Sequence, residues 1–406
     1  MSKKPKIILH LDGDSFFVAC EVSLNPKLKN KPVITGFERG IATAMSQEAK
    51  KLGISRGMPV FKIKKLYPKV IIVNSNYHSY EMFSQRAFNI VRRYTPFVEE
   101  YSIDECFADL SNLSNPVKIA GEIKADLKRE LGIIFSVGLG PTKVIAKVAS
   151  KWNKPDGFTV IEPKDIPKFL KDLPMGKVWG IGPATSIHLQ KLGIKTALEL
   201  IERPEEWARD NLSKPELERW FELRGESVYK IHTEPNDNQA SIQTTRTFPK
   251  TKNKEMIFSE LSKNIEDACS RMRQQKLKSK KVYLFLKTQE FRYKRAEMSL
   301  LSPTDSPTTV LNAIRGSFNF LYDPSIEYRS SGITLSELTP SRNTQNDLFG
   351  EVVKNDKKNE LFKVVDKLEK RFGNNIIQLS SSLNASKKRG LHAERRLWIP
   401  CMGEVV

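Results

Sequence analysis

A pair of acidic segments that lie far apart in the chain constrains the fold more than any other feature. Residues 11–17 read L-D-G-D-S-F-F and place Asp12 directly after an apolar run, and residues 101–109 read Y-S-I-D-E-C-F-A-D and place Asp104 and Glu105 side by side. Either segment alone is typical of a solvated acidic turn. Together they offer the carboxylate oxygens that hard divalent cations such as Mg²⁺ prefer in proteins. The sequence therefore favours a fold that brings the two segments together.

The sequence around these acids predicts an α+β fold. Short apolar runs between turn signals predict strands, and apolar residues at helical spacing predict helices between them. The predicted elements are a strand at 6–11, a helix at 79–94, strands at 98–101 and 106–110, a helix at 119–131, a strand at 133–139 and a helix at 142–149. This order is typical of a sheet with its helices on one face. In such a sheet the first strand ends beside the hairpin turn, so we expect Asp12 to meet Asp104 and Glu105.

The charge balance indicates a polyanionic partner. Of 406 residues, 67 are Lys or Arg and 47 are Asp or Glu, which gives a formal net charge of +20. Nucleic acid is the usual partner of so basic a chain, although a solvated basic surface would have the same composition. No apolar run approaches the roughly 20 residues of a membrane helix. The four scattered cysteines form neither a disulfide framework nor a zinc site, which fits a cytoplasmic protein.

Several segments resemble the signature segments of one enzyme family, and they occur in family order. L-D-G-D-S-F-F-V-A-C-E and E-E-Y-S-I-D-E-C-F-A-D-L are similar to the two acidic motifs of Y-family (translesion) DNA polymerases. Residues 40–59 resemble the fingers motif of that family, and 136–147 (S-V-G-L-G-P-T-K-V-I-A-K) and 153–157 (N-K-P-D-G) resemble its palm segments. The resemblance runs from Lys6 to about Leu338 and leans in places toward the polymerase V catalytic subunit.

The resemblance implies a right-hand polymerase with a ferredoxin-like palm, small fingers, a helix-hairpin-helix thumb and an α/β little-finger domain. Linker composition and changes in the predicted elements suggest where these parts begin and end. The expected divisions are 1–165 for the palm with inserted fingers at about 23–78, 166–233 for the thumb, 234–241 for a linker, 242–340 for the little finger, and 341–406 for a C-terminal tail.

The resemblance also implies roles for individual residues. Asp12, Asp104 and Glu105, with the carbonyl of Gly13, would hold two Mg²⁺ ions, with Mn²⁺ as a possible substitute, and would catalyse nucleotidyl transfer. Asp14 and Asp109 are read as structural. Phe17 would be the steric gate that excludes a ribose 2′-hydroxyl. The residues implied to contact the incoming nucleotide are Phe16, Gln47, Lys50 and Lys154.

Gln47 departs from the family pattern. The family usually has a tyrosine here, whose hydroxyl donates to a phosphate. Glutamine can also donate, so a weakened contact is expected rather than a lost activity.

Two regions are predicted to bind DNA, and a third region is predicted to bind a sliding clamp. Residues 178–194 resemble a helix-hairpin-helix in which Gly180 and Gly182 permit a tight turn and backbone N–H groups face a phosphate. The stretch 271–295 holds ten cations against one acid. The segment Q-N-D-L-F at 345–349 resembles the clamp-binding pentapeptide. The residues predicted for DNA are Arg246, Lys280, Lys281, Arg292, Lys294 and Arg295, and those for the clamp are Gln345, Leu348 and Phe349.

The expected function is template-directed, error-prone translesion synthesis without proofreading, as part of the SOS response, by a monomeric polymerase subunit that binds primer-template DNA and dNTP. Two alternatives remain open from the residues alone. One is a catalytically inactive family relative that acts as a scaffold on DNA and the clamp. The other is a metal-dependent DNA nuclease, since two-metal carboxylate chemistry would serve it as well.

Overall fold

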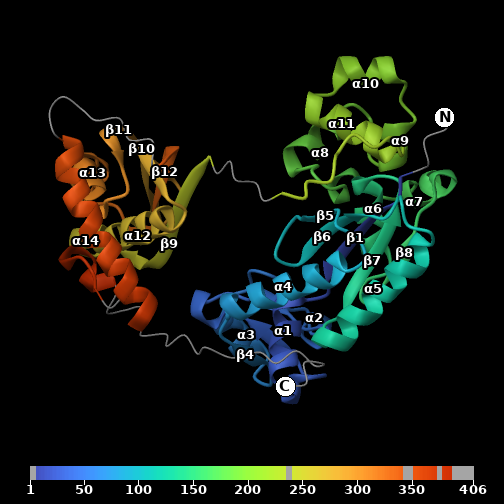
Figure 1. Cartoon of the computed structure of the whole chain (residues 1–406), viewed down its shortest axis with the longest axis horizontal. Helices are drawn as coiled ribbons and strands as arrows, with labels where there is room; N and C mark the ends of the chain where they lie inside the picture. Colours follow the sequence, from blue (N-terminus) through green and yellow to red (C-terminus); the bar gives the residue numbers. More distant parts are fainter. Residues whose placement is uncertain (1–5, 235–239, 342–350, 373–376, 386–406) are drawn as a thin grey trace. The chain divides into compact units, whose positions relative to one another are not determined.

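The computed structural model describes residues 6–234, 240–341, 351–372 and 377–385. The chain divides into two compact units between residues 235 and 236, and each unit is described by itself (Figure 1). The α+β prediction is confirmed, because both units combine sheets with helices.

A five-stranded sheet forms the centre of the first unit, in the order β5-β6-β1-β7-β8. Its strands run antiparallel except for the parallel pair β7 and β8. The bounds are β1 Ile8–Gly13, β5 Val98–Glu100, β6 Glu105–Asp109, β7 Phe135–Gly140 and β8 Phe158–Val160. Strand β1 is therefore central and lies directly beside β6, the second strand of the acidic hairpin.

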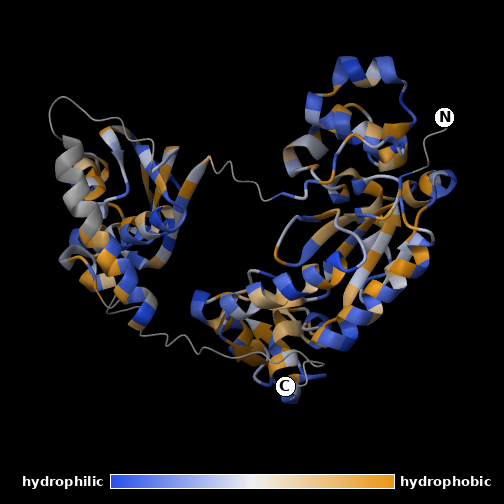
Figure 2. Ribbon diagram, viewed as in Figure 1, coloured by the Kyte–Doolittle hydropathy of each residue, from blue (hydrophilic) through white to orange (hydrophobic). Residues whose placement is uncertain are grey.

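Helices cover both faces of this sheet, so the prediction that they lie on one face is wrong. Helices α4 (Tyr77–Arg92) and α5 (Pro116–Leu131) pack with Leu9 and Leu11 of β1 in one core. Helix α6 (Lys143–Trp152) packs on the opposite face, which carries Ile8 and His10. The amphipathic character of α5 is visible as alternating blue and orange in Figure 2.

The close approach of α6 has a simple cause in the sequence. Strand β7 reads F-S-V-G-L-G, so its large side chains all point to the α4–α5 face and small residues face α6. A Cβ atom on Gly138 would lie 2.1 Å from the backbone nitrogen of Ser150 and 2.2 Å from the carbonyl oxygen of Ala146. Only glycine permits that contact, which brings the side chains of α6 against the end of β1.

Two smaller groups of elements complete the first unit. One is a three-stranded sheet in the order β3-β2-β4 with its own apolar cluster. The other is a set of short helices around the buried Trp220. The remaining bounds are α1 Phe16–Leu24, β2 Val33–Thr35, β3 Ala44–Met45, α2 Gln47–Lys51, α3 Val60–Leu66, β4 Ile71–Val73, α7 Ile166–Leu170, α8 Pro183–Lys191, α9 Ala197–Ile201, α10 Glu205–Asn211 and α11 Lys214–Leu223.

The second unit is an antiparallel sheet in the order β11-β10-β12-β9 with helices on one face. Its strands are β9 Ser241–Thr251, β10 Leu277–Thr288, β11 Tyr293–Thr304 and β12 Tyr328–Pro340. Helices α12 (Lys254–Gln274) and α13 (Pro307–Leu321) cover the face that carries Val282, Leu284 and Leu286. The alternation predicted for 282–286 is confirmed, and the other face of the sheet has no helix packed on it among the described residues.

Part of the C-terminal tail packs on the second unit. Helix α14 (Glu351–Phe372) joins it through Asp366, which accepts two hydrogen bonds from Arg273 of α12, at 2.6 and 2.7 Å. Further along, Glu266 accepts hydrogen bonds from the backbone of Leu379 and the hydroxyl of Ser382. These contacts make residues 361–385, where described, an added layer on α12.

Candidate active site and nucleic-acid interface

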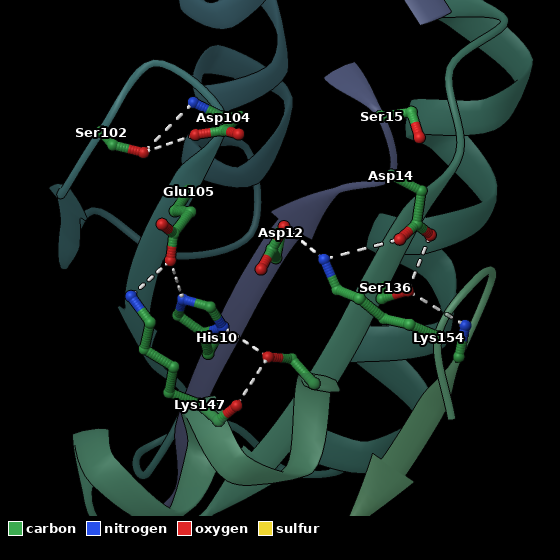
Figure 3. A network of polar contacts seen from close by, with 12 residues as sticks. His10, Asp12, Asp14, Ser15, Ser102, Asp104, Glu105, Ser136, Lys147 and Lys154 are labelled. Atoms are coloured by element: carbon green, nitrogen blue, oxygen red, sulfur yellow. Dashed lines mark hydrogen bonds and ion pairs between the residues drawn. The ribbon is translucent and has the colours of Figure 1, made fainter. Parts of the chain in front are cut away.

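The strand end and the hairpin turn meet, as predicted. Asp12 and Glu105 are direct partners in the antiparallel ladder between β1 and β6. The backbone N–H of Gly13 donates to the carbonyl of Asp104 at 2.9 Å. The three acids therefore lie together at one end of these strands, although more than ninety residues separate Asp12 from the other two in sequence (Figure 3).

The side chain of Glu105 is held by two groups from the α6 face of the sheet. His10 Nε2 lies 3.0 Å and Lys147 Nζ 2.5 Å from its carboxylate. Burial by itself would raise the pKa of Glu105, but the hydrogen bonds and charges of His10 and Lys147 outweigh it and lower the pKa to about 2. Glu105 is therefore a fixed, ionised carboxylate.

His10 is fully buried and acts as the link between β1 and α6. Its Nδ1 lies 2.7 Å from the hydroxyl of Ser150. Burial lowers the pKa of His10 despite the neighbouring Glu105. A neutral ring can donate Nε2–H to Glu105 while Nδ1 accepts from the serine.

Asp12 is paired with a lysine from another segment. Lys154 Nζ lies 2.5 Å from the Asp12 carboxylate and 3.5 Å from that of Asp14. Burial raises the pKa of Asp12, and the charge of Lys154 opposes that shift. A buried carboxylate of this kind needs a cation beside it to stay ionised.

Asp14 fixes the segment that carries Lys154. It accepts hydrogen bonds from the hydroxyl of Ser136 at 2.7 Å and from the backbone N–H of Asp156 at 2.8 Å (Figure 3). These two hydrogen bonds agree with the interpretation of Asp14 as a structural residue. Asp109, likewise, accepts from the backbone and hydroxyl of Ser111 at the end of β6.

The donor set suits a hard divalent cation, although the side chains now satisfy one another. Asp104 accepts from the hydroxyl of Ser102 at 2.6 Å, Asp12 faces Lys154, and Glu105 faces Lys147. In the parts of the chain that the structure describes, no three acidic, histidine or cysteine side chains are grouped as a metal site. The ammonium groups of Lys147 and Lys154 balance the negative charge of these carboxylates. They lie where the carboxylates would attract other cations.

Lys50 and the start of α1 lie at the same edge. Lys50 Nζ donates to the hydroxyl of Ser15 at 2.9 Å. Ser15 is the residue before α1, in a left-handed conformation with φ of 55°, and its side chain makes no capping hydrogen bond to the helix. Burial lowers the pKa of Lys50. The first N–H groups of a helix have no partner within it and attract anions.

The two predicted aromatic residues differ in their surroundings. Phe16 is buried against Phe135, so only its backbone can reach a ligand. Phe17 is half-buried and stacks on Tyr80, with ring centroids 4.6 Å apart and an interplanar angle of 13°. Tyr77 meets the same ring edge-on at 5.5 Å. These contacts fix the orientation of Phe17.

Gln47 is the first residue of helix α2. The hydroxyl of Ser46 caps this helix by accepting from the N–H of Ala49. Gln47 is half-buried, and Lys50 is one turn further along α2. The two side chains at positions i and i+3 therefore lie on neighbouring parts of one short helix surface.

The glycine turn predicted at 178–194 is present. Gly180 has a φ of 82°, a left-handed conformation that favours glycine at this position. Gly182 is the N-cap of α8, and a Cβ atom there would meet nothing within 4 Å. The N-terminus of α8 is thus open, as a phosphate contact would need.

The cations of the second unit do not share one face of its sheet. Arg273 pairs with Asp366, Arg246 lies 3.8 Å from Glu260 of α12, and Lys294 lies opposite Leu286 in the ladder, on the helix-covered face. The alternation of a strand sends neighbouring residues to opposite faces.

The other DNA-binding candidates lie elsewhere on the unit. Arg295 and Lys281 are on the open face, opposite Phe285 and Ser299 in the ladder. Lys280 is exposed at a bulge in β10, and Arg292 lies in the turn before β11. The clamp candidates Gln345, Leu348 and Phe349 lie outside the described residues.

Comparisons with known proteins agree with this arrangement. The impB/mucB/samB family matches residues 11–151, its C-terminal domain matches 239–348, and its helix-hairpin-helix motif matches 163–194. DNA polymerase IV of Staphylococcus aureus (strain JH9) is 33% identical, and the alignment covers 83% of this chain and 96% of the relative. The Y-family DNA polymerase chimera Dbh-Dpo4(243-245)-Dbh has the same fold, with a TM-score of 0.70 at 23% identity over 82% of this chain and 99% of that chain. The chain belongs to the Y family of DNA polymerases.

Other relatives extend the match along the chain. DNA polymerase IV of Desulfatibacillum aliphaticivorans is 29% identical over 95% of this Y-family chain and 99% of the relative. Protein ImpB of Salmonella typhimurium is 30% identical, with 88% and 89% covered. None of the described helices is long and apolar enough to cross a membrane.

Sequence reasoning missed the residues that hold the acids in place. The sequence predicts His10 only as part of an apolar strand and Lys147 only as part of the helix at 142–149, and Ser150 lies one residue beyond that helix. A signal was present, because His10 stands two residues before Asp12 and so shares its face of the strand. The contact of α6 with that face could not be read from one sequence.

Proposed function

We propose that this Y-family chain extends a primer by template-directed nucleotidyl transfer at the edge formed by Asp12, Asp104 and Glu105. DNA polymerase activity, with translesion synthesis, is the function of the family to which it belongs. The proposal that these three residues catalyse the reaction is supported by the pairing of Asp12 with Glu105 on adjacent strands, next to Asp104.

The metal ions of the reaction are part of this proposal. Asp12 and Asp104, with the carbonyl of Gly13, would hold one Mg²⁺ ion, and Glu105 would join them around a second, with Mn²⁺ as a possible substitute. Such a pair of ions supplies Lewis acidity to the attacking 3′-hydroxyl and to the departing pyrophosphate. The fixed orientation of Glu105 by His10 and Lys147 means that little rearrangement of this carboxylate is needed.

Lys50 and Lys154 are proposed to bind the triphosphate of the incoming dNTP. They approach the end of β1 from different segments, Lys50 through Ser15 and Lys154 through Asp12 and Asp14. Mobile ammonium groups suit the several charges of a triphosphate. The backbone N–H groups of Phe16 and Phe17 at the start of α1 would add donors of the same kind.

Phe17 is proposed to exclude ribonucleotides. Its stacking on Tyr80 prevents the ring from turning aside, so the ring can block a 2′-hydroxyl by contact alone. Gln47 is proposed to donate its side-chain amide to a phosphate in place of the usual tyrosine.

The division into palm, fingers, thumb, linker, little finger and tail is proposed as predicted from the sequence. The unit boundary between 235 and 236 and the family matches at 11–151, 163–194 and 239–348 support it. The sliding-clamp contact through 345–349 and a monomeric subunit are proposals that rest on sequence alone.

The alternative functions fit less well. An inactive scaffold would not need three acids at one edge with their supporting lysines and histidine. A nuclease would have no use for an aromatic residue fixed beside the acids, nor for a pair of lysines suited to a triphosphate. The relatives are named as polymerases.

Primer extension on undamaged and abasic templates tests the proposal. We expect Asp104→Ala to lower the rate by about 10³-fold, because metal-assisted charge stabilisation is worth several kcal/mol and each 1.36 kcal/mol is tenfold in rate. Asp210→Ala, an exposed acid on α10, is the matched control and should extend normally. Equal extension by wild type and Asp104→Ala would show that the chemistry lies elsewhere.

A further inference from the structure

Three aromatic rings surround the ammonium group of Lys147, the residue that forms an ion pair with Glu105 (Figure 3). Lys147 Nζ lies 4.4 Å from the ring centroid of Tyr101, 5.1 Å from that of Trp179 and 5.9 Å from that of Phe107. We name these three rings the lysine enclosure. Aromatic rings attract an ammonium group, most strongly where it is desolvated. The Lys147 side chain is 5% exposed, so the lysine enclosure and Glu105 together determine where its ammonium lies.

Trp179 is the member of the lysine enclosure that comes from outside the acidic hairpin. Tyr101 and Phe107 flank the hairpin turn at Asp104 and Glu105. The indole of Trp179 meets the Tyr101 ring edge-on, with centroids 5.2 Å apart, and lies 5.5 Å from the Phe107 centroid. Its Nε1–H donates to the hydroxyl of Tyr101 at 2.9 Å. Ring contacts and a directional hydrogen bond thus give the indole one orientation against the acidic hairpin.

Trp179 also belongs to the turn that leads into α8. The backbone N–H of Ile181 donates to the carbonyl of Val178 at 3.1 Å, which closes a four-residue turn with Trp179 second and Gly180 third. The φ of 82° at Gly180 is typical of the third residue of a type II turn. Gly182, the N-cap of α8, follows this turn. A short hydrogen-bonded stretch of backbone therefore connects the indole to the open N-terminus of α8.

A fourth ring limits the movement of the indole. The ring centroid of Tyr229 lies 5.9 Å from that of Trp179. The backbone N–H of Tyr229 donates to the fully buried Glu222 at 2.8 Å, and the same carboxylate accepts from the backbone N–H of Val144 in α6 at 3.3 Å. The indole thus packs against a segment that is itself tied to α6, the helix that carries Lys147. Close packing of this kind passes a shift of one side chain on to its neighbours.

We propose that Trp179 is a positioning residue that joins the turn before α8 to the Glu105 carboxylate through Lys147. A DNA phosphate held at the turn fixes the indole, the indole holds the Lys147 ammonium on Glu105, and Glu105 is thereby oriented for Mg²⁺. Coupling between two binding events is reciprocal, so DNA at the turn and Mg²⁺ at the acids strengthen each other's binding. The proposal rests on the proposed polymerase function and on the DNA contact predicted for Gly180 and Gly182.

The affinity of the full chain for a labelled primer-template tests the proposal, measured in EDTA and in Mg²⁺ at equal ionic strength, without dNTP. We expect the ratio of the Kd in EDTA to the Kd in Mg²⁺ to be about 5-fold larger for the wild type than for Trp179→Leu, the lower end of the range for coupled sites. Competition of Mg²⁺ for DNA phosphates is the same in both proteins and cancels. Trp207→Leu, which removes a half-buried indole from α10, is the matched control and should keep the wild-type ratio.

Tyr101→Phe tests the same link with the packing retained, because it keeps the ring and removes only the hydroxyl that accepts from the indole. It should lower the affinity ratio in the same direction as Trp179→Leu, at the wild-type melting temperature. A tryptophan that only added apolar contact area would change the DNA affinity equally with and without Mg²⁺. The wild-type ratio in both variants would therefore overturn the proposal.

The route through Lys147 is tested by combining substitutions in primer extension. At saturating DNA and dNTP, Trp179→Leu should lower kcat by about 10-fold, the lower end of the effect of groups that orient a metal ligand. The double change Trp179→Leu with Lys147→Met should be no slower than Lys147→Met alone, because both act on one ion pair. Losses that multiply would contradict this route. Wild-type extension reports on the polymerase assignment separately, so normal wild-type extension with unchanged affinity ratios would reject this proposal alone.

Discussion

Asp12 and Glu105 lie opposite each other on adjacent antiparallel strands, and each is paired with a lysine from a different segment. Lys154 reaches Asp12 from the loop after α6, and Lys147 reaches Glu105 from within α6. The two lysines have different surroundings. Lys147 is 5% exposed at its side chain, and Lys154 is 30% exposed. Lys147 is therefore the more enclosed of the two lysines, and Lys154 is the more accessible to solvent.

Lys147 is expected to act by positioning Glu105. Lys147→Met keeps the length of the side chain and removes the ammonium, and supporting groups of this kind are worth about 10- to 100-fold. We expect kcat to fall by that factor, with the KM for dNTP unchanged and a higher Mg²⁺ concentration for half-maximal rate. Lys147→Arg should restore part of the activity. A raised KM at normal kcat would instead show that Lys147 binds the nucleotide.

Phe17 is expected to set sugar discrimination. Phe17→Ala should raise the relative use of ribonucleotides by roughly 10²-fold, the discrimination that a shape-based pocket achieves against an added hydroxyl. Incorporation of rNTP and dNTP by single-nucleotide extension measures it. Phe17→Tyr keeps the ring and is the control. If Phe17→Ala discriminates as the wild type does, the ring does not contact the sugar.

Gln47→Tyr is expected to lower the KM for dNTP, because it supplies the hydroxyl donor that the resemblance to the family implies at this position. Steady-state primer extension with varied dNTP measures the change. Gln85→Tyr, at an exposed site on α4, controls for the addition of a tyrosine. An unaltered KM would place position 47 out of contact with the triphosphate.

The two faces of the second unit are expected to differ in their salt dependence. Arg295→Ala, on the open face, should weaken primer-template binding alike on all sequences and reduce the slope of log affinity against log salt by about 1. Lys294→Ala, the neighbouring residue on the helix-covered face, should leave the slope unchanged. Binding titrations at several salt concentrations provide the slopes. Equal slopes of log affinity against log salt for the two variants would contradict the prediction that DNA contacts the open face and not the helix-covered face.

Asp366→Ala is expected to destabilise the second unit by about 3 kcal/mol, because it leaves a buried guanidinium without its carboxylate. The Arg273 side chain is 8% exposed and donates a hydrogen bond to each carboxylate oxygen of Asp366. Urea denaturation followed by circular dichroism measures the loss. Lys367→Ala, exposed on the same helix, is the control. The double change Arg273→Met with Asp366→Leu should recover most of the stability, since it removes both charges together.

Local patterns were sufficient to place the acids and most elements of the first sheet. Asp12 ends a strand because six apolar-rich residues precede it, and the hairpin at 98–109 follows from two short strands around a polar turn. The turn at Gly180 could also be predicted from the local sequence, since its left-handed φ favours glycine.

The tertiary structure decided which side chains support those acids and which cations share a face. Lys147 reaches Glu105 because Gly138 lets α6 lie against the sheet, and His10 reaches it through the pairing of β1 with β6. Both contacts join segments that no local period connects. In the second unit the sequence shows ten cations at 271–295, but strand alternation places Lys294 and Arg295 on opposite faces of the sheet, and Arg273 of α12 pairs with Asp366 of α14. Residue identity and spacing determine the local conformation and the chemistry available. Long-range packing determines which of those groups meet, because their separation in space is not a function of their separation in sequence.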